Sequence, residues 1–162
     1  QILKKNLSHW VGNATQVIHL DFHTGLGKKA TYKLLTKEST ESETAQWLID
    51  KFGSNLVETK DRRNTGYLIR GGLGTWCQAT LSQCQYYFVT AEFGTYPLLQ
   101  VLEALRQENY AHFWTPSDES FYQNAKKRLL EVFAPIDQHW RNAVVSKGLA
   151  LVKKAISICP KD

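Results

Sequence analysis

Apolar and polar side chains alternate along residues 17–22, and two glycines follow within residues 23–27. The alternation predicts a β-strand, and the glycines predict a tight turn after it. Asp21 and His23 then stand at the carboxyl end of the strand and on one face, because side chains two residues apart share a face. In α/β sheets this end borders the crevice where ligands bind. The alternative is a half-buried strand in which the two side chains hydrogen-bond only to each other and to backbone.

The rest of the chain changes between strand and helix patterns. A β-rich composition predicts strands over 30–36 and 86–91. Apolar spacing and capping residues predict helices over 1–12, 42–52, 78–84, 118–133 and 136–158, and another from Pro97 onward. A polar loop over 59–66 and a glycine-rich turn over 71–74 lie between these elements. Because helices alternate with strong strands, the predicted fold class is α/β.

Composition narrows the class of protein. A chain of 162 residues with 43% hydrophobic and 22% charged residues fits one globular domain. No apolar run is long enough to span a membrane, and the scattered lysines behind the net charge of +5 do not indicate nucleic-acid binding. The three cysteines match no zinc or redox motif, which favours reduced, buried thiols and a cytoplasmic location. The chain begins with Gln1 and contains no methionine, and we therefore expect it to be a fragment of a longer protein.

Two phrases of the sequence carry a family resemblance. Residues 20–27, Leu-Asp-Phe-His-Thr-Gly-Leu-Gly, and residues 90–95, Thr-Ala-Glu-Phe-Gly-Thr, resemble signatures of the zinc carboxypeptidase superfamily, in a bacterial branch described as a domain of unknown function. That superfamily includes carboxypeptidase A-like and aspartoacylase-like enzymes. The resemblance implies a three-layer sandwich of the phosphorylase/hydrolase-like type, with a twisted mixed sheet between helices. Residues 1–162 would be a single, incomplete domain, the C-terminal part of a catalytic domain.

The resemblance also implies roles for particular residues. His23 matches a zinc ligand, and Glu92 matches the catalytic glutamate. Tyr67 matches a substrate-binding tyrosine. Thr24, which is next to His23 in the sequence, is assigned to substrate binding together with Tyr67. Such a site hydrolyses a peptide or amide bond, because zinc activates a water whose proton the glutamate accepts. The expected substrate is a peptide, or an N-acyl amino acid if the enzyme is a deacylase.

The other zinc ligands of the superfamily are missing from the sequence. They come from a His-x-x-Glu motif, and none of the five histidines here has Glu three residues later. One His cannot hold a catalytic zinc alone, so zinc would require ligands from outside this chain. A non-catalytic binding module with the same fold therefore stays open as the alternative. In either case a sheet lacking some of its strands exposes an edge, and we expect association through that edge.

Overall fold

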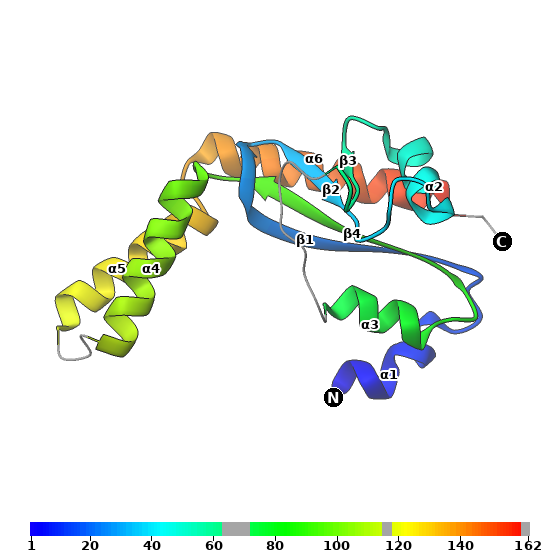
Figure 1. Cartoon of the computed structure of the whole chain (residues 1–162), viewed down its shortest axis with the longest axis horizontal. Coiled ribbons are helices and arrows are strands. Elements are labelled where there is room, and N and C mark those ends of the chain that lie inside the picture. Colours follow the sequence, from blue (N-terminus) through cyan, green and yellow to red (C-terminus); the bar gives the residue numbers. More distant parts are fainter. Residues whose placement is uncertain (63–71, 115–117, 160–162) are drawn as a thin grey trace. The chain divides into compact units, whose positions relative to one another are not determined.

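The fold is α/β, as the sequence predicts, and its sheet is mixed and open. A computed structural model describes residues 1–62, 72–114 and 118–159 (Figure 1). The elements are α1 (Ile2–Val11), β1 (Gln16–Lys29), β2 (Tyr32–Leu35), α2 (Glu43–Phe52), β3 (Val57–Glu58), α3 (Leu73–Thr80), β4 (Gln85–Gly94), α4 (Leu98–Trp114), α5 (Glu119–Phe133) and α6 (Gln138–Ile158). The four strands lie in the order β1-β4-β2-β3. Strands β2 and β3 are parallel, with Leu34 opposite Val57.

The chain divides into two compact units, residues 1–21, 34–91 and 149–162 in the first and residues 22–33 and 92–148 in the second. In the first unit, Leu7 of α1 and Cys77 of α3 meet Leu81 and Tyr86 in one buried cluster. A Cβ at Gly74 would lie 2.2 Å from the Phe88 ring, so only glycine lets α3 approach β4 this closely.

The second unit contains the helix pair α4 and α5, which lie side by side (Figure 1). Their apolar contact centres on Val101 and Ala104 of α4 and Val132 of α5. Helix α5 begins where the Asp118 side chain accepts a hydrogen bond from Phe121 N at 2.9 Å. This is the usual N-cap arrangement, and it fixes the start of the helix.

The predicted turn after residue 22 is wrong, because β1 continues through both glycines to Lys29. Gly25 and Gly27 have φ of 145° and 103°, which glycine adopts without steric cost, so the chain stays in the strand instead of reversing. The glycine-rich stretch before Trp76 also differs from prediction, since α3 already begins at Leu73.

The cysteines and the helices bear on two further expectations, of buried thiols and of a chain without a membrane span. All three cysteines are free thiols, but only Cys77 is fully buried. Within the described ranges, no helix combines the length and apolar character that crossing a membrane requires. Tyr67 and the loop that carries it lie outside the described residues.

Candidate active site

The carboxylate of Glu92 is the centre of the candidate site. Glu92 lies on β4, next to β1 in the sheet, and its residue surface is only 7% exposed. Leu26 N on β1 donates a hydrogen bond to Glu92 Oε1 at 2.9 Å. A buried carboxylate needs such compensation, because it has lost its water. Burial nevertheless raises the pKa of the Glu92 carboxyl above its ordinary value, against smaller lowering effects of the Leu26 N–H and of the His23 charge.

His23 belongs to the same unit and lies close enough for its charge to act on Glu92. It is exposed and lies well inside β1, so the prediction that it ends a strand is wrong. Gly25, two residues further, shares its strand face, and a Cβ there would lie 3.7 Å from Glu92 Oε1. The carboxylate and the imidazole therefore face the same side of the sheet, which is the arrangement that a joint role requires.

The peptide group between Gly25 and Leu26 of β1 is hydrogen-bonded at both its C=O and its N–H. The partners are a residue of β4 and the residue that follows β4. Thr95 Oγ1 donates to Gly25 O at 2.9 Å, while the N–H of the same peptide, Leu26 N, binds Glu92. Thr95 is 1% exposed, so this hydroxyl has no water to replace its partner. The hydroxyl, the peptide and the carboxylate form a short chain of hydrogen bonds, in which each bond polarises the next. Sequence analysis did not identify Thr95, although it closes the phrase that contains Glu92.

Two glycines let backbone and ring atoms close around this peptide. A Cβ at Gly25 would lie 2.9 Å from Phe133 Cε1, so the end of α5 packs directly on the strand there. A Cβ at Gly94 would lie 2.3 Å from Lys28 O, so only glycine lets the backbones of β4 and β1 approach this closely. Trp140 Nε1 of α6 donates to Gly94 O at 2.8 Å and secures the same point.

The structure does not bring all predicted site residues together. Thr24 is adjacent to His23 on β1, and strand alternation directs its side chain to the opposite face. Tyr67 lies outside the described residues. The described part of the chain contains no group of three or more His, Cys, Asp or Glu side chains that could hold a metal ion. These residues alone therefore do not fit a catalytic zinc, for which His23 would be one ligand among at least three.

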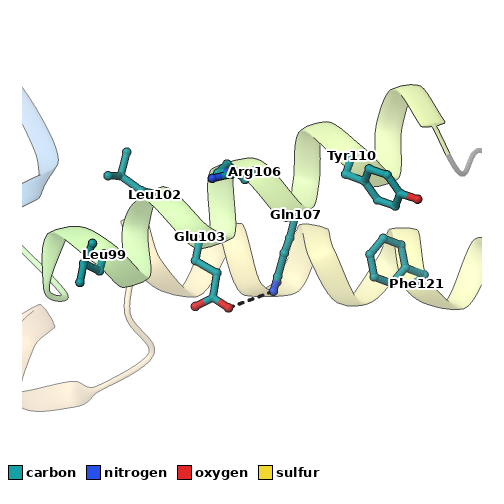
Figure 2. Close-up of a pocket in the computed structure, with 7 residues that line it drawn as sticks. All are labelled: Leu99, Leu102, Glu103, Arg106, Gln107, Tyr110 and Phe121. Atoms are coloured by element: carbon teal, nitrogen blue, oxygen red, sulfur yellow. Dashed lines mark hydrogen bonds between the residues drawn. The ribbon is translucent and has the colours of Figure 1, made fainter.

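A hollow on the second unit lies away from the buried carboxylate. It has a volume of about 550 Å³ and is lined by α4 residues and by Phe121 of α5 (Figure 2). Neither Glu92 nor His23 lines it. An apolar pocket is the usual first hypothesis for a ligand site, but here it lacks a buried polar group and does not coincide with the buried carboxylate.

The comparison with known proteins gives a family without an assigned activity. The family described as "Protein of unknown function (DUF2817)" matches residues 1–147. No curated protein and no solved structure matches the chain. The match covers the strands that carry His23 and Glu92 and most of the helices. The chain therefore belongs to the DUF2817 family of proteins of unknown function.

Proposed function

We propose that this chain supplies the general base of a hydrolytic site for a peptide or amide bond, with Glu92 as the base. The observation that carries the proposal is the buried Glu92 carboxylate, which is fixed by Leu26 N and faces the same side as the exposed His23. A general base must be held within hydrogen-bond reach of the proton that it removes, and the Leu26 N–H fixes the carboxylate in one orientation. A merely structural carboxylate would more often lie at the surface.

The two oxygens of the carboxylate have separate tasks in this proposal. Oε1 accepts the Leu26 N–H, which fixes the orientation of the group. Oε2 then accepts a proton from the attacking water and returns it to the leaving amine. Burial keeps the carboxylate poorly solvated, which favours acceptance of a proton.

His23 is proposed as a metal ligand, with its partners supplied from outside this chain. Zinc bound in this way would lower the pKa of a water and polarise the scissile carbonyl. The proposed relationship to zinc carboxypeptidases rests on residues 20–27 and 90–95 of the sequence. The substrate, a peptide or an N-acyl amino acid, and the cytoplasmic location rest on sequence reasoning as well.

The test uses the longest natural form of the protein, loaded with zinc and assayed on a panel of peptides and N-acyl amino acids. Glu92→Gln should cut turnover by roughly 10²–10⁴, the usual contribution of a general base, and should leave the zinc content unchanged. His23→Ala should instead reduce the zinc content. Glu41→Gln, at an exposed carboxylate in the other unit, is the matched control and should behave like wild type.

The outcomes separate the candidate functions. Turnover that survives Glu92→Gln would refute the role of the base. Preference for N-acyl amino acids over peptides would identify a deacylase. Substrate or peptide binding without any turnover in the wild-type protein would identify the non-catalytic module.

A further inference from the structure

Helix α4 carries a stripe of residues with the spacing of a coiled coil. Leu99, Glu103, Arg106, Tyr110 and Phe113 follow one another at intervals of four, three, four and three residues. This is the heptad spacing, which keeps side chains on one seam of a helix. All five are exposed, and Leu99 (79%), Tyr110 (53%) and Phe113 (65%) are large apolar side chains. We name these five residues the α4 stripe.

The α4 stripe lies apart from the buried face of α4, and of its five residues Tyr110 also meets a ring of α5 in the same unit. Val101, Ala104 and Ala111 are the buried residues of α4, and the first two pack against α5. At 100° per residue, the stripe lies on the opposite side of the helix from them. Figure 2 shows Leu99, Glu103 and Tyr110 on α4, with Phe121 of α5 next to Tyr110. All four residues line the hollow, and the ring centroids of Tyr110 and Phe121 are 6.1 Å apart. Four of the five stripe residues, Leu99, Glu103, Arg106 and Tyr110, therefore line an open hollow.

The charges of the stripe are arranged symmetrically. Glu103 and Arg106 occupy its middle, and they are equally distant from a point midway between Ala104 and Leu105. Leu99 and Tyr110 are also equally distant from that point. A twofold axis through it therefore places each acidic residue opposite a basic one and each leucine opposite a tyrosine.

We propose that a second copy of this chain docks on the α4 stripe, with the two α4 helices antiparallel. Glu103 would face the partner's Arg106 twice in the dimer, and Leu99 would face the partner's Tyr110. In heptad terms each layer joins an a position to a d position, as antiparallel helix pairs do. A parallel pair would instead place Glu103 against the partner's Glu103 and Arg106 against the partner's Arg106. Those like-charge contacts disfavour the parallel arrangement.

The size of the stripe sets the expected strength of the dimer. Helix α4 has 17 residues and is about 25 Å long. Its leucine and aromatic side chains offer several hundred Å² per copy, somewhat less than the roughly 800 Å² per partner of stable complexes. A contact of this size predicts a reversible dimer and not a permanent one.

The experiment is sedimentation velocity on the whole chain, at protein concentrations from about 1 μM to about 300 μM. Wild type should shift from monomer to dimer across this range. Glu103→Arg or Arg106→Glu alone should weaken dimerisation at least tenfold, because each creates two like-charge contacts. The double variant Glu103→Arg/Arg106→Glu should restore it, because the swapped charges are again complementary under the twofold axis. Circular dichroism would confirm that each variant keeps its helices.

The matched control is Leu130→Glu, at an exposed leucine of α5 that is not part of the stripe. It should dimerise like wild type. A chain that stays monomeric throughout the range would overturn the proposal, because no second copy would then bind. So would a dimer that tolerates both single reversals, or that the double swap fails to restore, since another surface would then hold it.

Discussion

The hydrogen bond between Leu26 N and Glu92 Oε1 can be tested by comparing two substitutions of Glu92. Glu92→Ala removes the acceptor and leaves the Leu26 N–H without it, at a residue that is itself partly buried. An unsatisfied buried N–H costs about 1–3 kcal/mol. Glu92→Gln keeps an oxygen acceptor in the same place. We therefore expect the Ala variant to be less stable than the Gln variant by about 1–3 kcal/mol, or about 2–12 °C in melting temperature for a domain of this size.

The same pair of variants tests the burial of the charge. The pKa of Glu92 is raised above its ordinary value of 4.5, mainly by burial. Folding therefore favours the protonated carboxyl, and its stabilising contribution is complete below pH 4.5 and is lost as the pH rises through the raised pKa. Wild type should lose stability relative to Glu92→Gln over that interval. The difference between the Gln and Ala variants should not change with pH, because neither variant has a carboxyl at this position.

Thermal unfolding followed by circular dichroism at several pH values between about 4 and 8 measures both effects. Equal melting temperatures for the Ala and Gln variants would mean that the hydrogen bond to Leu26 contributes nothing. A difference between wild type and Glu92→Gln that stays constant with pH would mean that burial does not raise the pKa of the carboxyl. Either result would refute the reasoning from the structure.

Two further substitutions test the surroundings of the same peptide group. Thr95→Val should lower the free energy of unfolding by about 1–3 kcal/mol and speed hydrogen exchange of the Leu26 amide, because the buried Gly25 O loses its donor. Thr95→Ser should restore the stability and the slow exchange. A Val variant with wild-type exchange would contradict the arrangement. Gly94→Ala should lower the free energy of unfolding, measured with denaturant, by about 1–3 kcal/mol or more. The new Cβ would lie 2.3 Å from Lys28 O, so the backbone must move by about 1 Å. A stability equal to that of wild type would show that the two strands are not in this contact.

Elements with local signals could be predicted from the sequence. Helix α2 is capped at its start by Ser42, whose side chain accepts a hydrogen bond from Ala45 N, and at its end by Gly53, which has a φ of 100°. Both signals lie within a few residues of the helix, so the predicted bounds are close to those observed. Strand β3 was not predicted, because Val57–Glu58 is too short for a pattern and forms only by pairing with β2.

In the candidate site, too, local signals identify some residues, while others depend on contacts between distant parts of the chain. His23 and Glu92 are proposed because the two phrases that contain them resemble a known family. The Leu26 N–H could not be proposed from the sequence, because every residue except proline has a backbone N–H and no side chain marks the one that is used. Its bond to Glu92 joins residues 66 apart in the sequence, and the bond of Thr95 to Gly25 joins residues 70 apart. Such pairs depend on how β1 and β4 align, which local patterns do not determine.

The doubly held peptide between Gly25 and Leu26 has a consequence for the alignment of the two strands. Glycine-rich strands are prone to slip by a residue, because few side chains oppose the shift. Here a slip of one residue would break the Thr95 and Glu92 bonds together and bring the Gly94 backbone against different atoms. Glu92 thus protects against slippage whether or not it takes part in catalysis. A relative that had lost all activity would still be expected to keep an oxygen acceptor, Glu or Gln, at this position.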